Sequence, residues 1–243
     1  ATKGWLSTAA AKASDITEGP SFVTATGGTI TTSGNFKIHT FTGPGTFTVS
    51  NAGNSSGSNS VDYMVVAGGG GGTGGRGDGG GGAGGYRESS GAASGCYTAS
   101  PLGSGVSALP VTAQGYPITV GAGGTAGNVC IQGQPGNNSI FSTITSAGGG
   151  GANGRCTPGS SSGTAGQPGG SGGGGGSGAT GPNQTAGGSG NTPPVSPPQG
   201  NNGGTGNPIN ISPFNNQAGG GGGGATATGG PTSGGTGGNG GAG

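Results

Sequence analysis

The chain has 243 residues, of which 73 are glycine, and only 5% of its residues are charged, against a usual share of about 25%. A hydrophobic fraction of 26% is too small for a conventional apolar core in a chain this long, and a net charge of +1 offers no basic surface for nucleic acid. The sequence has no apolar run of the roughly 18 residues that a membrane span requires, so we expect neither nucleic-acid binding nor membrane insertion.

Residues 1–26 form the first of three zones. Their Ala-rich stretch, GWLSTAAAKASDI, is compatible with one short helix that begins at Ser7 or Thr8 as its N-cap. An N-terminal attachment or docking segment, or a linker, is the alternative, and the sequence leaves both open.

Residues 27–67 alternate between apolar and polar side chains, as strands with one buried face do. We therefore predict a small antiparallel β unit. Gly43-Pro44-Gly45 predicts a turn between its first two strands. The strands that we expect cover residues 36–42, 45–50 and 61–67.

Residues 68–243 consist of glycine tracts separated by short conventional stretches. Two of these stretches, residues 116–123 and 138–151, resemble strands that continue directly into glycine, as residues 61–72 also do. We expect Tyr86-Arg87-Glu88 to mark the exit from the first tract into a long loop. The tracts are residues 68–85, 121–127, 148–154, 169–181, 219–224 and 229–243.

Glycine can adopt the extended polyproline II conformation, with three residues per turn and a rise of about 3.1 Å. Such helices can pack side by side and pair their backbone groups with their neighbours, so a bundle of them needs little apolar volume. Its sequence should repeat every three residues, with non-glycine residues on an outward-facing edge. The positions that fit this repeat are Thr236, Asn239 and Ala242, and also Ser171, Ser177 and Thr180.

The fold class predicted is therefore mainly irregular and all-β: a small antiparallel β unit over residues 27–67, followed by a bundle or sandwich of polyglycine II helices with intervening loops over 68–243. A disordered Gly/Ser linker is the rival interpretation. Hydrophobic strands that lead directly into the glycine tracts favour the bundle, because a flexible linker has no need of them.

Several motifs support the same interpretation. The stretches TFTVSNAG, VDYMVVAGGGGGTGG…GGAGGYRE, YPITVGAGG and NSIFSTITSAGGGGAN resemble the glycine-rich domain of bacteriophage tail-fibre and other virion proteins. The chain is also similar to the tail-fibre adhesins of T-even-type phages, which carry a polyglycine II sandwich. The resemblance covers residues 27–243, and it implies a rigid scaffold whose distal loops bind a host surface receptor.

The residue types available argue against an enzyme. The first tract contains GxGxxG matches, but neither a following helix nor an acidic residue about 20 positions on supports a dinucleotide site. Asp78 sits one position early for a calcium-binding nonapeptide repeat, and that match does not recur. His39 lies beside Lys37 on a predicted strand, without a nearby acidic partner, so we expect a surface histidine. We predict no catalytic residues, no cofactor and no metal site.

Three cysteines, Cys96, Cys130 and Cys156, lack metal-ligand spacing. If the protein works outside cells, a disulfide between Cys130 and Cys156, or between Cys96 and Cys156, is plausible. Three free thiols are the alternative.

Recognition is better supplied by the loops, because loops on a rigid scaffold commonly carry binding. We expect a virion fibre or fibre-tip adhesin, exposed on the outside of the particle, that binds a host receptor of protein or glycan and contacts other fibre proteins. A structural subunit that assembles as a homo-oligomer through its glycine-rich faces is the alternative, and an antifreeze-like bundle is a third idea. The receptor-binding candidates are Tyr97, Pro193, Pro194, Val195, Pro197, Asn215 and Asn216.

Overall fold

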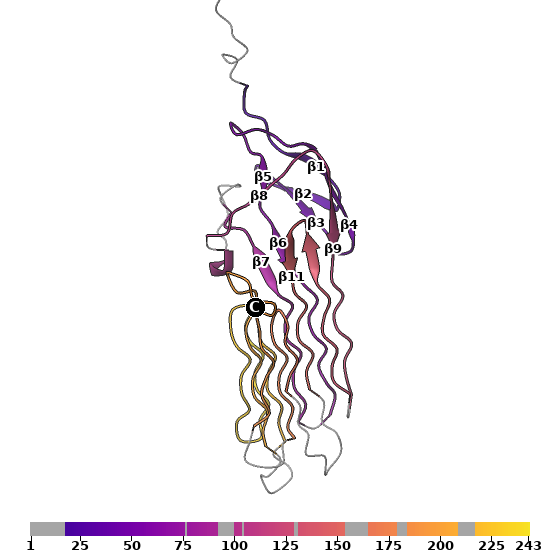
Figure 1. Ribbon diagram of the computed structural model, residues 1–243, viewed down its shortest axis with the longest axis vertical. Coiled ribbons are helices and arrows are strands. Elements are labelled where there is room, and N and C mark those ends of the chain that lie inside the picture. Colours follow the sequence, from indigo (N-terminus) through magenta and orange to yellow (C-terminus); the bar gives the residue numbers. More distant parts are fainter. Residues whose placement is uncertain are drawn as a thin grey trace, which may run out of the picture.

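The computed structural model describes residues 18–75, 77–91, 100–103, 105–128, 131–153, 165–178, 184–208 and 217–243. The molecule is elongated, with small β-sheets at one end and a bundle of extended glycine tracts at the other (Figure 1). The predicted fold class is confirmed, since the sheets are antiparallel and the bundle is irregular in secondary structure. Over the described residues, no helix is long and apolar enough to cross a membrane.

The strands of the described structure are short, and all of them lie in the first 150 residues. They are β1 (Thr24–Thr26), β2 (Thr29–Ser33), β3 (Phe36–Thr40), β4 (Gly45–Asn51), β5 (Ser60–Val61), β6 (Met64–Val66), β7 (Tyr86–Glu88), β8 (Leu109–Pro110), β9 (Gly115–Thr119), β10 (Ser139–Phe141) and β11 (Ile144–Ser146), with a 3-10 turn η2 (Pro101–Gly103) before β8. The N-terminal zone was predicted to be either a short helix or a docking segment. Most of this zone, residues 1–17, lies outside the described residues.

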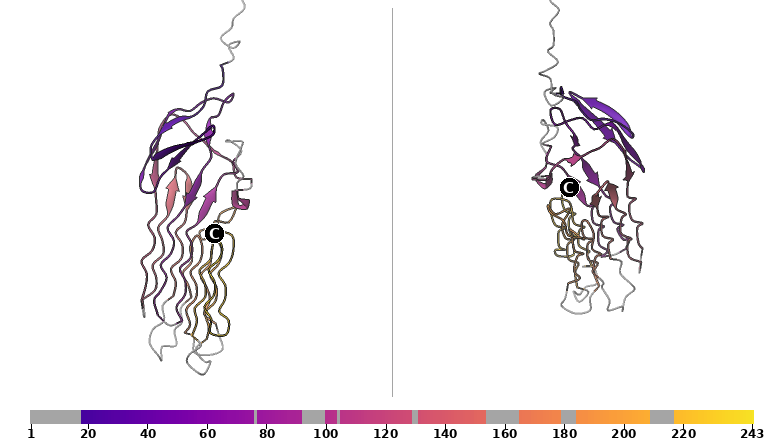
Figure 2. Two further views of the ribbon diagram at one scale, coloured as in Figure 1. Left: turned by 180° about the vertical axis from the view of Figure 1, so that it is seen from behind. Right: turned by 45° about the horizontal axis from the view of Figure 1, so that its top comes forward.

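We call the end of the molecule that holds the β-sheets the head. Its apolar core forms on the largest sheet, whose strand order is β1-β4-β9-β10-β11. In β4, alternation buries Phe47 and Val49, which pack with Val111 and Tyr116. The Thr112 side chain and N–H hydrogen-bond the phenol of Tyr116, and these bonds lower its pKa below the ordinary value. This sheet combines β1 and β4, which precede residue 67, with β9, β10 and β11, which follow it (Figure 2).

Pairing within the head differs from the predicted unit. The turn at residues 43–45 does not close a hairpin, because β3 pairs with β2 while β4 pairs with β1 and β9. His39 is half-buried rather than a surface residue: its Nδ1 lies 2.8 Å from the Gly27 carbonyl oxygen, and its ring meets Phe47 edge-on.

The predicted strand over residues 61–67 is interrupted. Asp62 and Tyr63 separate β5 from β6, because the Ser89 hydroxyl donates to the Asp62 carboxylate at 2.7 Å and accepts from the Tyr63 N–H at 3.1 Å. Tyr86-Arg87-Glu88 does not leave the structure as a loop but forms β7, which pairs with β6.

The bundle is built from extended tracts joined by backbone hydrogen bonds. The segment expected as one tract over 68–85 is a pair of antiparallel tracts, because the chain reverses between Thr73 and Asp78. The tracts are 67–72, 79–85, 121–127, 133–137, 147–153, 165–169, 170–177, 185–189, 200–207, 218–224, 227–232 and 238–242.

Hydrogen bonding in the bundle repeats every three residues. In tract 67–72, the N–H groups of residues 68 and 71 donate to tract 133–137, and the carbonyls of the same residues accept from tract 147–153. The N–H groups of residues 67 and 70 donate to tract 79–85, and the carbonyls of residues 69 and 72 accept from tract 121–127. Bonds that point to different sides at intervals of three are the arrangement expected for polyglycine II.

Tract 170–177 is the centre of the bundle and is buried along its whole length. Its backbone is hydrogen-bonded to six surrounding tracts, so peptide groups take the place that apolar side chains hold in an ordinary core. The six are 79–85, 147–153, 165–169, 185–189, 200–207 and 218–224.

Side chains interrupt the glycine tracts in two different ways. Thr236, Asn239 and Ala242 are all exposed, as the three-residue repeat predicts. The prediction was wrong for Ser171 and Ser177, which are 0% and 1% exposed, because their tract lies at the centre of the bundle. Thr180 lies outside the described residues.

Candidate recognition surface

The proline-rich loop 191–199 is the best-defined candidate site in the described part of the chain. It joins tract 185–189 to tract 200–207 at the end of the bundle that faces the sheets. The Gln199 carbonyl accepts from the N–H of Tyr86 in β7 at 2.8 Å, and the Thr192 N–H donates to Gly169 at 2.9 Å. Both ends of the loop are thus tied to the scaffold.

Asn191 shapes the loop from inside. Its Oδ1 accepts from the N–H groups of Val195 at 3.0 Å and Gln199 at 3.3 Å, while its Nδ2 donates to the Val195 carbonyl at 3.1 Å. The residue has a φ of 49°, a left-handed conformation that asparagine tolerates better than most residues. One amide side chain therefore closes the turn around Val195.

Gln199 fastens the loop to the bundle. It is 1% exposed, its Oε1 accepts from the Ala147 N–H at 2.8 Å, and its Nε2 donates to the Pro193 carbonyl at 2.9 Å. A buried amide whose oxygen and nitrogen are both paired fixes its surroundings, because leaving either unpaired would cost free energy. These hydrogen bonds accordingly hold the loop in one arrangement.

The outer side of the loop is uncharged and rich in proline rings. Among the predicted recognition residues, Pro193 and Pro194 are exposed, while Val195 and Pro197 are half-buried. The peptide bonds Thr192–Pro193 and Ser196–Pro197 are cis. The exposed residues of the loop are Thr192, Pro193, Pro194, Ser196 and Pro198.

The other predicted site residues lie outside the described part of the chain: Tyr97, Asn215, Asn216, and the cysteines Cys96, Cys130 and Cys156. Asn207 and Ala218, which flank the stretch holding Asn215 and Asn216, are paired through the Asn207 N–H at 3.0 Å. Four of the seven predicted receptor-binding residues therefore lie in the described structure, all of them in the proline-rich loop.

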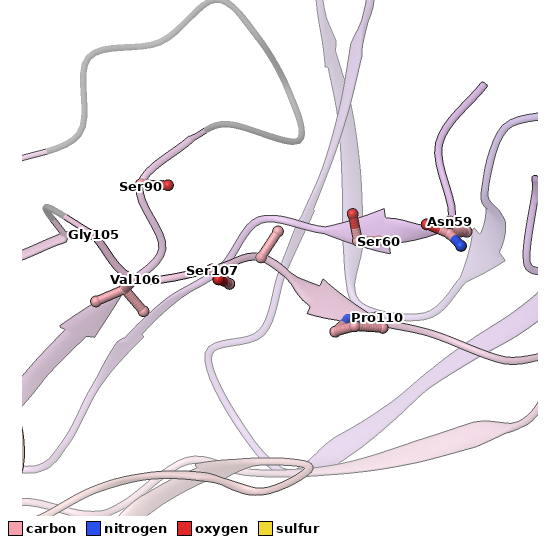
Figure 3. Close-up of a pocket in the computed structure, with 8 residues that line it drawn as sticks. Asn59, Ser60, Ser90, Gly105, Val106, Ser107 and Pro110 are labelled. Atoms are coloured by element: carbon pink, nitrogen blue, oxygen red, sulfur yellow. The ribbon is translucent and has the colours of Figure 1, made fainter. Parts of the chain in front are cut away.

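A second candidate site is a hollow in the head, beside strands β5 and β8. It is an open hollow of about 450 Å³ whose polar lining includes the side chains of Asn59, Ser60, Ser90 and Ser107 (Figure 3). Val106 and Pro110 supply apolar surface. Among the described residues that line the hollow none is charged, so they offer hydrogen bonds but no ion pair.

The buried carboxylate of Glu88 is paired with two hydroxyl groups and so has a structural role. It is 6% exposed and accepts from the hydroxyls of Tyr86, at 2.8 Å, and Ser100, which joins β7 to the segment leading into η2. Within the described residues, no group of three His, Cys, Asp or Glu side chains could hold a metal ion.

Sequence reasoning singled out the prolines but missed Asn191 and Gln199, the two amides that hold them. A signal was available, because these amides bracket the stretch NTPPVSPPQ and such side chains commonly close turns on nearby backbone. Sequence reasoning also missed four tracts in which other residues separate the glycines. These tracts are 133–137, 165–169, 185–189 and 200–207.

A family model described as a glycine-rich domain matches residues 40–243. No curated protein matches the chain, and no solved structure matches it.

Proposed function

Because the chain belongs to the glycine-rich domain family, we propose that it is a non-enzymatic bacteriophage virion protein, a tail fibre or fibre-tip adhesin that binds a host surface receptor. The observation that carries this proposal is the proline-rich loop, which is exposed, uncharged and locked by Asn191 and Gln199. The resemblance of the strand-to-glycine motifs to virion proteins supplies the biological context.

The mechanism is contact by a preorganised loop. Binding by a flexible loop costs conformational entropy, whereas the hydrogen bonds of residues 191–199 order this loop in advance. Several copies on one particle would add avidity without new contacts, provided that they reach the host surface together. The partners would be a receptor of protein or glycan and the neighbouring fibre proteins, on the outside of the virion.

Cell binding tests this proposal. Fluorescently labelled protein is incubated with a panel of bacterial strains, and binding is compared for the wild type and a Pro194→Arg, Pro198→Arg double variant. A Pro135→Arg, Pro231→Arg double variant is the matched control, because these two prolines are also exposed but lie elsewhere on the bundle. We expect the loop variant alone to lose at least about tenfold in affinity, since bulky charged groups disrupt a close uncharged contact.

Equal binding by the loop variant and the wild type would remove the loop from recognition. Absence of wild-type binding to every strain would count against the adhesin itself.

A structural subunit is the second candidate, and the outer tracts of the bundle favour it. Tracts 121–127 and 133–137 form one margin of the bundle and present exposed Ala122, Thr125, Gln134 and Asn137. Such an uncharged margin could pair with another copy side by side. Analytical ultracentrifugation and electron microscopy distinguish the two: filaments or lateral arrays support the structural subunit, and a monodisperse particle that binds cells supports the adhesin.

A further inference from the structure

Asparagine followed by glycine is the sequence most prone to spontaneous deamidation. The backbone nitrogen of the glycine attacks the asparagine side-chain carbonyl carbon, and glycine favours this attack because it has no Cβ to hinder the approach. The chain contains three such pairs: Asn153–Gly154, Asn202–Gly203 and Asn239–Gly240. The bundle places the three asparagines in very different surroundings.

Asn239–Gly240 is the accessible pair. It lies in the outer tract 238–242, and both residues are exposed. Within the described part of the chain, neither the Asn239 side chain nor the Gly240 N–H forms a hydrogen bond. No described atom lies within 4 Å of a Cβ placed on Gly240, so the Cβ side of this residue is not packed against another tract.

Asn202–Gly203 is protected although Asn202 is exposed. The Asn202 Oδ1 accepts from the Gly190 N–H at 2.8 Å, and the Gly203 N–H donates to Gly188 at 3.0 Å. A Cβ on Gly203 would lie 2.1 Å from the Gly173 carbonyl oxygen, so this backbone is packed against the central tract. Both reacting groups must leave their partners before they can meet.

Asn153 is protected by burial. Its side chain is 1% exposed, and its Oδ1 accepts from the Gln132 amide at 3.4 Å.

We propose that Asn239 is a site of spontaneous modification in the folded protein. The Gly240 nitrogen forms a bond to Cγ of Asn239 and loses its proton, the side-chain nitrogen leaves as ammonia, and a succinimide results. Water then opens either carbonyl of this ring, which yields aspartate or isoaspartate and adds one negative charge. No oxidant or cofactor is required, and the step accelerates as pH rises because the attacking nitrogen must give up its proton.

Isoaspartate disturbs the bundle through its main chain. The Gly238 and Gly241 N–H groups flank residue 239 and donate to Gly219 and Gly222, so donors and acceptors are both three residues apart. Isoaspartate inserts one methylene into the main chain between them, which lengthens it by about 1.5 Å. The two bonds cannot both keep their length, so the outer tract loosens. Aspartate adds the charge without this change of register.

Peptide mapping by mass spectrometry tests the proposal on the full chain. The folded protein is incubated at mildly alkaline pH and sampled over time, with isoaspartate detected by enzymatic methyl labelling. We expect Asn239 to convert at least about tenfold faster than Asn202, because conversion at Asn202 requires local opening of the packed tract. In guanidinium the two should convert at similar rates. Conversion of Asn202 as fast as Asn239 in the folded protein, or an intact Asn239 after the denatured sample has reacted, would overturn the proposal.

Two variants complete the test. Gly240→Ala should slow conversion of Asn239 while preserving the fold, since the added methyl group has space but hinders the attacking nitrogen. Asn239→Asp should retain hydrogen-exchange protection at Gly241, whereas the isoaspartate fraction should lose it. Equal protection in these two forms would refute the change of register, and unchanged conversion in Gly240→Ala would refute the proposed attack.

Discussion

A Cβ atom on Gly70 would lie 2.1 Å from the carbonyl oxygen of Gly150, because their tracts pack backbone against backbone. On Gly72, two positions along, the nearest atom would be the Gly81 nitrogen at 3.8 Å, an ordinary contact. Neither glycine has a left-handed φ, so alanine is conformationally allowed at both.

Gly70→Ala and Gly72→Ala therefore test the packing of the bundle. We expect Gly70→Ala to lower the free energy of unfolding by about 1–3 kcal/mol or more, as overpacking does. Gly72→Ala should change it by less than about 1 kcal/mol, because alanine also restricts the unfolded chain. Urea unfolding measures both, and equal effects of the two substitutions would contradict close backbone packing at Gly70.

Ser171 and Ser177 form a second matched pair, since both are buried in tract 170–177. The Ser171 hydroxyl donates to the Gly224 carbonyl at 3.1 Å, whereas the Ser177 hydroxyl has no hydrogen-bond partner within the described structure. We expect Ser171→Ala to destabilise by about 1 kcal/mol, and Ser177→Ala to be neutral or stabilising because it removes an unpaired buried group. Thermal unfolding should rank Ser177→Ala above Ser171→Ala; the reverse order would show that Ser177 is paired.

Gln199→Ala should destabilise the protein and release the proline-rich loop. It leaves the Ala147 N–H and the Pro193 carbonyl without their partners, at a cost of about 1–3 kcal/mol if they stay buried. Hydrogen exchange at the Val195 amide should rise in parallel. Gln134→Ala is the control, because Gln134 is exposed. Unchanged exchange at Val195 would mean that Asn191 alone holds the loop.

The heat capacity of unfolding should be unusually low. Exposure of apolar surface raises it and exposure of polar surface lowers it, with a typical net value of about 12–15 cal/mol/K per residue. This bundle buries peptide groups instead of apolar side chains, so we expect a value clearly below that range. Differential scanning calorimetry at several pH values provides the measurement, and a typical value would indicate more buried apolar surface than the small core around Phe47 and Tyr116 supplies.

The sequence by itself determined the class of the structure. Alternating stretches such as GTFTVS, which became β4, and YPIT, most of β9, identified strands, and the scarcity of charged and apolar residues excluded an ordinary core. The three-residue spacing of Thr236, Asn239 and Ala242 correctly indicated an exposed edge. These features are local, because they depend only on the period with which side chains leave an extended backbone.

Only the tertiary structure decided which edges are buried. Ser171 and Ser177 keep the same spacing as Thr236 and Ala242, yet tract 170–177 is surrounded and tract 238–242 is not. In tract 200–207, a Cβ placed on Gly200, Gly203 or Gly206 would come within 2.3 Å of tract 170–177, so every third residue there must be glycine. A threefold period shows which residues share an edge, but each edge takes its environment from whichever tract packs beside it, and those neighbours are distant in the chain.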